Sequence, residues 1–120
     1  MENLDVKQIE ETIHKYFKGF SEAEPALVSE AFHSETRLYS VEEGQLDKTE
    51  MKDWLLNLQK RKEGGEKREG TLEILLLDQT KEAAIVKVKI TFKTMQFVDY
   101  LSLLKLGDAW KVVGKIYTVL

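Results

Sequence analysis

The chain has 120 residues, 42% of them hydrophobic and 32% charged, so we expect a single domain over residues 1–120 with one hydrophobic core. A net charge of −3 argues against nucleic acid as a partner, and the absence of cysteine excludes disulfides, thiolate nucleophiles and thiolate zinc sites. With only His14 and His33, and no apolar stretch of about 18 residues, we expect no metal, no cofactor, no membrane partner and a cytoplasmic location.

Three helices are predicted in the first half of the chain. Apolar side chains recur at steps of three and four over residues 6–20, which predicts a first helix capped at Asp5 and ended by Gly19 near Phe20. Pro25 suits the first turn of a second helix. A third helix is predicted to open at 47–49 and to end before Gly64.

Strands are predicted after each of the last two helices. The β-prone segment 36–41 indicates one short strand that ends in a turn. After Gly70 the pattern changes to four successive strands, over 72–77, 83–93, 97–106 and 109–119. Gly107 and Asp108 form a two-residue hairpin turn between the last two.

The register of these strands follows from that hairpin. If Leu106 lies opposite Ala109, counting back along the strands sets Ile116 opposite Asp99 on an inner, mostly apolar face. Matching the apolar sides then sets Phe92 opposite Phe97. Three helices followed by an antiparallel meander predict an α+β domain, in which a curved sheet wraps around the helices and leaves a conical cavity.

Asp99 is the first candidate for a functional side chain. An acid on the inner face must be hydrogen-bonded, paired or protonated, and it could serve as a proton donor, a base or a ligand anchor. It could equally accept hydrogen bonds from helix amides or Trp54 and only lock the helices to the sheet, or lie solvated near the mouth.

The predicted cavity wall is mainly aromatic and would suit a small apolar or heterocyclic molecule, although plain core packing uses the same residue types. The predicted lining is Tyr16, Phe20, Phe32, Tyr39, Trp54, Ile90, Phe92, Phe97, Asp99, Leu101, Trp110 and Ile116.

The outer face of the predicted sheet is too apolar to remain in water, and lysines lie among its apolar residues. A two-fold homodimer interface is the natural explanation, with another protein or an anionic molecule as alternative partners. The predicted dimer face is Leu75, Leu77, Ile85, Val98, Tyr100, Leu104, Val113, Lys115 and Tyr117.

Several short motifs resemble the nuclear transport factor 2-like superfamily, and more closely its family of small bacterial proteins described as "Putative lumazine-binding". They are Tyr16-Phe17-x-Gly19-Phe20, Ala31-Phe32-His33, Glu43-Gly44-x-Leu46, Trp54, Phe97-x-Asp99-Tyr100-Leu101-x-Leu103 and Trp110-Lys111-Val112-Val113-x-Lys115. The resemblance covers nearly the whole chain. It implies a cone-shaped α+β barrel, commonly dimeric through the open sheet face, with a central cavity, and it leaves the function open because the superfamily includes both enzymes and binding domains.

Three functions stay open on this basis. The first is a homodimeric pocket protein that binds a small apolar or heterocyclic molecule anchored by Asp99. The second is an isomerase, dehydratase or cyclase in which Asp99 moves a proton and Tyr16 or His33 polarises an oxygen. Ketosteroid isomerase also pairs a first-helix tyrosine with a strand aspartate, but the carboxylate base that it needs is missing from 36–41. The third is a dimeric scaffold without a ligand.

The second function also competes with ordinary structural roles for its two helper residues. Tyr16 would serve equally as a core aromatic, and His33 as a residue at a helix end that the helix dipole favours when protonated.

Overall fold

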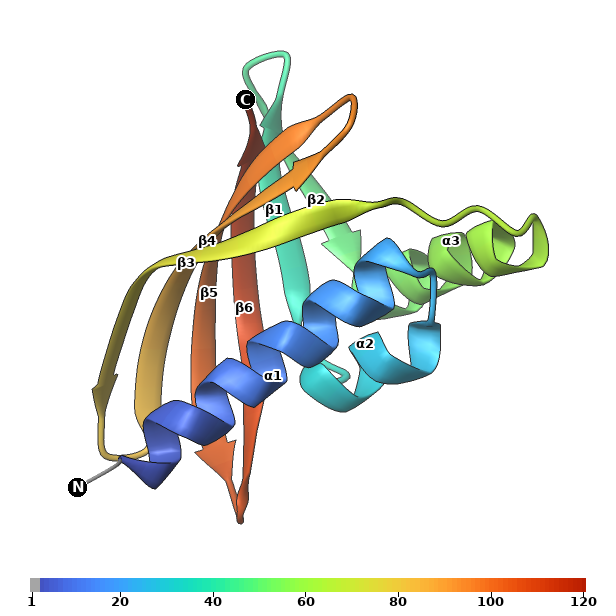
Figure 1. Cartoon of the computed structure of the whole chain (residues 1–120). Coiled ribbons are helices and arrows are strands. Elements are labelled where there is room, and N and C mark those ends of the chain that lie inside the picture. Colours follow the sequence, from blue (N-terminus) through green and yellow to red (C-terminus); the bar gives the residue numbers. More distant parts are fainter. Residues whose placement is uncertain (1–2) are drawn as a thin grey trace.

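The structure is a computed structural model that describes residues 3–120 (Figure 1). Within these residues the chain forms three helices and one six-stranded sheet of strand order β2-β1-β6-β5-β4-β3. Neighbouring strands are antiparallel except β1 and β6, which are parallel. The elements are α1 (Leu4–Ser21), α2 (Pro25–Ala31), β1 (Arg37–Glu42), β2 (Gln45–Glu50), α3 (Met51–Glu63), β3 (Gly70–Thr80), β4 (Ala83–Phe92), β5 (Gln96–Leu106) and β6 (Ala109–Val119).

The helices lie on one face of the curved sheet, and α1 crosses that face diagonally (Figure 1). Ile9, Ile13 and Tyr16 recur at helical spacing and are completely buried against the sheet. The hydrophobic core therefore lies between the helices and the inner face of the sheet. This arrangement confirms the predicted α+β class and the helix-filled barrel.

Both ends of α1 differ in detail from the prediction. The cap is Asn3, whose side chain accepts a hydrogen bond from the Val6 amide at 3.2 Å, while Asp5 lies inside the helix. Gly19 does not end the helix. It allows close packing instead, because a Cβ there would lie 2.7 Å from Cγ2 of Val28 in α2. Pro25 opens α2 as predicted.

Strand β2 was not expected, because its residues were predicted to begin the third helix. Glu43 and Gly44 form a tight turn with positive φ of 48° and 78°, and β2 pairs with β1 along its whole length. Asp47 and Thr49 resemble helix caps in the sequence, but they pair with β1 instead, so α3 begins only at Met51.

A β-bulge changes the register of β6. Strands β5 and β6 pair as predicted from Leu106 and Ala109 to Leu103 and Val112, but the next pair is Ser102 with Gly114, so Val113 is an extra residue. One extra residue moves every later side chain to the opposite face.

The faces predicted for three residues of β6 are therefore wrong. Lys115 and Tyr117, expected on the outer face, point inward, where Lys115 is buried and Tyr117 half-buried. Ile116, expected to line the cavity, is exposed on the outer face. The cause is the bulge at Val113, which shifts the register of β6 by one residue.

The first strand of the meander also contains a bulge. The β3–β4 register shifts between Ile74 and Leu76, and β3 continues to Thr80. Leu77 consequently packs against the core opposite Val86, so its predicted place on the outer face is wrong. The β4–β5 pairing is offset from the prediction by two residues, with Ile90 opposite Phe97, and an even offset leaves every side chain on its predicted face.

Candidate functional site

Tyr16, Asp99 and Lys115 form a buried polar cluster inside the barrel, called here the Lys115 group. The Tyr16 hydroxyl donates a hydrogen bond to Oδ2 of Asp99 at 2.6 Å. Nζ of Lys115 donates to the same hydroxyl at 2.7 Å and lies 3.7 Å from Oδ2 of Asp99. Three elements therefore contribute one residue each: α1, β5 and β6.

Four aromatic rings surround the ammonium of Lys115. Its Nζ lies 4.7 Å from the ring centroid of Trp54, 4.9 Å from Tyr16, 5.0 Å from Tyr117 and 5.5 Å from Phe20. Cations are attracted to aromatic faces at such distances, most strongly when water is excluded. The rings thus partly replace the hydration shell that the lysine loses on burial.

Burial governs the protonation of this cluster. Tyr16 exposes none of its surface, and burial together with the neighbouring Asp99 raises the pKa of its hydroxyl well above the ordinary value. Burial also lowers the pKa of Lys115, an effect that Asp99 opposes. Because the Tyr16 proton is directed at Asp99, it is not available to a substrate oxygen, and Lys115 holds the remaining free N–H bonds of the cluster.

The predicted cavity is filled by side chains at this level of the barrel. Tyr16 and Ile90 have no exposed surface, which leaves no water-sized space beside them. The other predicted lining residues that are buried in the core are Phe32, Trp54, Phe92, Asp99, Leu101 and Trp110. Phe20 and Phe97 are half-buried. The rings of these lining residues that are in mutual contact, called here the aromatic cluster, are those of Tyr16, Phe20, Phe32, Trp54, Phe92 and Phe97, and the cluster reaches the surface at Phe20 and Phe97.

Three predicted site residues lie away from the interior. Tyr39 lies beside Ile116 on the outer side of the sheet, where both line a surface hollow. His33 lies in the turn after α2, where its Nδ1 accepts a hydrogen bond from the Glu35 amide at 3.1 Å. His33 therefore does not join Tyr16 and Asp99.

The outer face of the sheet holds an apolar groove of about 330 Å³. Tyr39, Leu76, Ile85, Tyr100 and Ile116 contribute to its lining. A neighbouring hollow of about 280 Å³ extends it over β1 and β2. Of the residues predicted on this face, Leu75, Ile85, Tyr100 and Leu104 are exposed, and Val98 and Val113 are half-buried.

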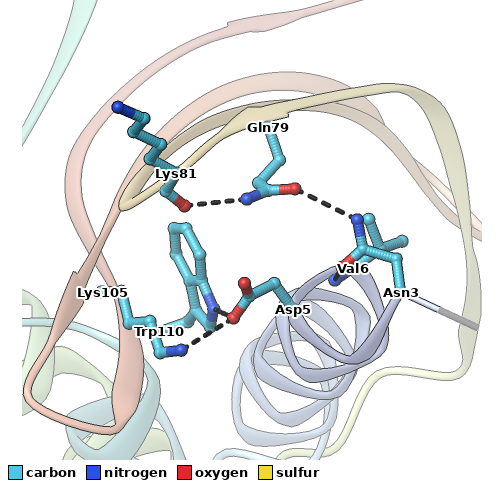
Figure 2. Close-up of polar contacts among 7 residues, drawn as sticks. All are labelled: Asn3, Asp5, Val6, Gln79, Lys81, Lys105 and Trp110. Carbon is cyan, nitrogen blue, oxygen red and sulfur yellow. Dashed lines mark hydrogen bonds and ion pairs between the residues drawn. The ribbon is translucent and has the colours of Figure 1, made fainter.

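A second polar cluster, called here the Asp5 group, lies at the start of α1 (Figure 2). Oδ1 of Asp5 accepts hydrogen bonds from Nζ of Lys105 at 2.9 Å and from Nε1 of Trp110 at 3.1 Å. Trp110, predicted to line the cavity, is instead the residue that joins this surface cluster to the core.

Sequence reasoning missed the role of Lys115 because the alternation of β6 placed it outside. The one signal available was the Val112-Val113 pair, since two adjacent apolar residues break a strict alternation and are compatible with a bulge. Arg61 was missed as well, because it lies in the basic last turn of α3, where the helix dipole alone accounts for a positive charge.

Residues 3–120 contain no cluster of three or more His, Asp or Glu side chains that could hold a metal ion. Among the same residues, no helix is long and apolar enough to cross a membrane.

Known proteins similar to this chain share its fold. No curated protein shows significant sequence similarity to it. A solved structure of an NTF2-like protein of unknown function from Shewanella baltica is 22% identical with a TM-score of 0.87, covering 100% of this chain and 98% of that one. A similar protein of unknown function from Silicibacter pomeroyi is 14% identical with a TM-score of 0.85, covering 97% and 96%.

A ketosteroid isomerase-like protein from Erwinia carotovora atroseptica is 14% identical with a TM-score of 0.73, covering 99% of this chain and 98% of that one. At such low identities these structures establish the fold alone. The family model described as "Putative lumazine-binding" matches residues 4–118. The chain therefore belongs to this family, and its fold is that of the NTF2-like structures.

Proposed function

We propose that the protein is a homodimer that binds a small, flat, apolar or heterocyclic molecule in the aromatic interior of its barrel, with Lys115 as the polar anchor. The observation that carries the proposal is the Lys115 ammonium itself. It is buried among four aromatic rings and directs one hydrogen bond to Tyr16, so it has further N–H bonds to donate.

The free energy lost by burying the charges of the Lys115 group supports a role in binding. A buried ion pair is often no more stabilising than apolar residues of the same volume, so stability alone is a weak reason for placing an ammonium, a phenol and a carboxylate here. A ligand oxygen or ring nitrogen could accept a hydrogen bond from Lys115 while its ring stacks on the neighbouring aromatic rings. Lumazine, which the family description names, is a flat heterocycle of this kind.

A ligand would reach Lys115 by way of the partly exposed rings beside it. Phe20 and Tyr117 contact the ammonium and are only half-buried, and Phe97 packs edge-to-face on Phe20 at 6.0 Å between centroids. Because the interior holds no water-sized space beside Tyr16, a ligand has to displace one of these rings. We therefore expect binding to be accompanied by a side-chain rotation at this edge.

Native mass spectrometry and a fluorescence titration with lumazine test the ligand proposal. We expect a mass adduct that mild unfolding releases, or saturable lumazine binding that Lys115→Met abolishes and Tyr16→Phe weakens about tenfold. Lys105→Met, which removes a lysine from the Asp5 group, is the matched control and should bind normally. A correctly folded protein that shows no adduct and no response to lumazine would contradict the proposal.

The homodimer is proposed on the composition of the outer face. Ile85 and Ile116 are each more than half exposed, and Tyr100 and Leu76 line the same groove. Charges of both signs occur on the same face, since Glu73 lies opposite Lys89 in the β3–β4 pairing. A two-fold axis through this face would bury the apolar residues of both copies and bring unlike charges together.

Light scattering coupled to size exclusion tests the dimer. We expect the mass of two chains for the wild type and of one chain for Ile116→Glu, because a carboxylate would be buried without a partner at the interface. Leu56→Glu is the control, since Leu56 is equally exposed but lies on α3. A monomeric wild type, or an Ile116→Glu variant that stays dimeric, would contradict the proposed interface and leave the ligand proposal standing.

A further inference from the structure

Two arginines lie where the end of α1 meets the loop that follows α3. Nη1 of Arg61 donates a hydrogen bond to the carbonyl oxygen of Phe20 at 3.0 Å. The backbone amide of Arg68 donates to the carbonyl oxygen of Ser21 at 2.7 Å. Both residues are thereby held against the same helix end.

Each guanidinium also lies over a ring of the aromatic cluster. Cζ of Arg61 is 5.7 Å from the ring centroid of Phe20, and Cζ of Arg68 is 5.9 Å from that of Phe92. The two rings contact each other edge-to-face, with centroids 5.6 Å apart. Two positive charges therefore border the aromatic cluster close to its half-buried residue Phe20.

Arg61 has unused hydrogen-bond donors. The Arg61 side chain is only 12% exposed, and its Nε and Nη2 are buried and have no hydrogen-bond partner. A buried donor without a partner is destabilising and is rare in native proteins. The nearby Arg68 adds repulsion, and burial together with this second charge lowers the pKa of Arg61.

One carboxylate already lies between the two arginines, within ion-pair distance of both but without a hydrogen bond to either. Oε2 of Glu66 is 3.7 Å from Nε of Arg61, and Oε1 is 3.9 Å from Nη2 of Arg68. Both distances exceed a hydrogen bond. The Glu66 side chain is more than half exposed, so it can move into solvent without losing a hydrogen bond to these arginines.

We propose that Arg61 and Arg68 bind the carboxylate of a small aromatic acid, which takes the place of the Glu66 carboxylate and packs its ring against Phe20 and Phe92. Guanidinium groups bind carboxylates through paired, charge-assisted hydrogen bonds, and a free acid can approach closer than a side chain tethered to the loop. The inference extends the proposed function by adding a negative charge to the ligand, and it rests on that function for the ring's entry into the aromatic cluster.

Three small probes separate charge from shape. Benzoate carries the ring and the carboxylate, benzamide has the same shape without the charge, and acetate has the charge without the ring. We follow the side-chain Nε–Hε signals of the arginines by NMR. Benzoate should shift the Arg61 and Arg68 signals saturably, benzamide should not shift them, and acetate should bind more weakly than benzoate. Added salt should weaken the benzoate response.

Variants of the loop provide the second test. Glu66→Ala removes the competing carboxylate and should tighten benzoate binding, while Arg68→Leu should weaken it about tenfold. Lys67→Leu removes the same charge from the adjacent, exposed position and should change benzoate binding little. These variants keep the bond from Arg61 to Phe20, so a loss of binding cannot be attributed to a loosened α1.

The results that overturn the inference are distinct from those that overturn the proposed function. Equal effects of benzoate and benzamide, or an unchanged benzoate affinity in Glu66→Ala, would show that Arg61 serves only to hold the end of α1. If lumazine binding through Lys115 persists in that case, only the carboxylate site is wrong. If benzoate binds at the arginines but Lys115→Met leaves lumazine binding intact, the anchor assigned to Lys115 is wrong instead.

Discussion

The Lys115 group and the Asp5 group contain similar chemistry in different surroundings. Each places a carboxylate against a lysine and an aromatic donor, Tyr16 in one case and Trp110 in the other. In the Asp5 group the carboxylate and the lysine side chain are each 30% exposed, whereas in the Lys115 group they are 1% and 5% exposed.

The difference in burial separates a structural link from a candidate site. Water and ions solvate the Asp5 group, so its ion pair contributes little and mainly ties the start of α1 to the β5–β6 hairpin. Around Asp99 and Lys115 the lost hydration is expensive, and the pair offsets it only in part. A hydrogen bond from a free N–H group of Lys115 to a ligand therefore stabilises the complex more than one from a free donor at the surface.

The largest expected effect comes from removing one charge of the buried pair. Lys115→Met should lower the free energy of unfolding by about 3–5 kcal/mol, because Asp99 is left as a buried charge without its lysine. Urea unfolding measures this loss, with Lys105→Met as the control that should change stability little. A second substitution, Asp99→Leu, should restore much of the lost stability by removing the remaining charge, and a double variant no more stable than the single one would contradict this account.

A smaller effect is expected from the Tyr16 hydroxyl, and it depends on pH. Above pH 10 the unfolded chain loses the tyrosine proton that the folded protein keeps, because the pKa of Tyr16 is raised by burial and by Asp99, so stability falls as pH rises. The lowered pKa of Lys115 has the opposite effect on stability. Below the ordinary pKa of 10.5 the unfolded chain holds a proton that the folded protein has lost, so this contribution makes stability rise with pH.

Tyr16→Phe isolates this contribution. The free energy of unfolding of the variant should be about 1–3 kcal/mol lower than that of the wild type at neutral pH, because two buried partners lose a hydrogen bond. When the pH is raised above 10, the free energy of unfolding should fall less in the variant than in the wild type. Urea unfolding over this pH range gives both values. In the wild type, ultraviolet absorbance should show that one of the four tyrosines ionises only on unfolding, and full ionisation of the folded protein would be inconsistent with a buried Tyr16.

The smallest effect is expected at the surface, on the acid side. Hydrogen bonds from Lys105 and then Trp110 lower the pKa of Asp5 below its ordinary 3.8, so its contribution is present above that value and is lost as pH falls through the folded pKa. Asp5→Asn should change stability at neutral pH less than Tyr16→Phe and should reduce the loss on acidification. Unfolding midpoints at neutral and acid pH check this, and a larger neutral effect for Asp5→Asn would reverse the comparison.

Local patterns were sufficient for most of the fold. The apolar stripe of α1, Pro25 at the start of α2 and the hairpin at Gly107 each depend on neighbours a few residues away, and the structure has them at the predicted places. The segment of β2 was misassigned because its caps and its polar composition suit a helix start, and only pairing with β1 makes it a strand. Asp99 was placed on the inner face correctly because the extra residue of the bulge lies in β6, which leaves the alternation of β5 unbroken.

The sequence by itself determined the helix faces, the order of the last four strands and the inward position of Tyr16 and Asp99, since these follow from periodicity and from close neighbours along the chain. Only the tertiary structure decided which face carries Lys115. The bulge at Val113 shifts one strand against its neighbour by a single residue, and this brings Lys115 to the Tyr16 hydroxyl while exposing Ile116. Such a shift depends on how whole strands pack against α1 and not on the residues of β6 alone.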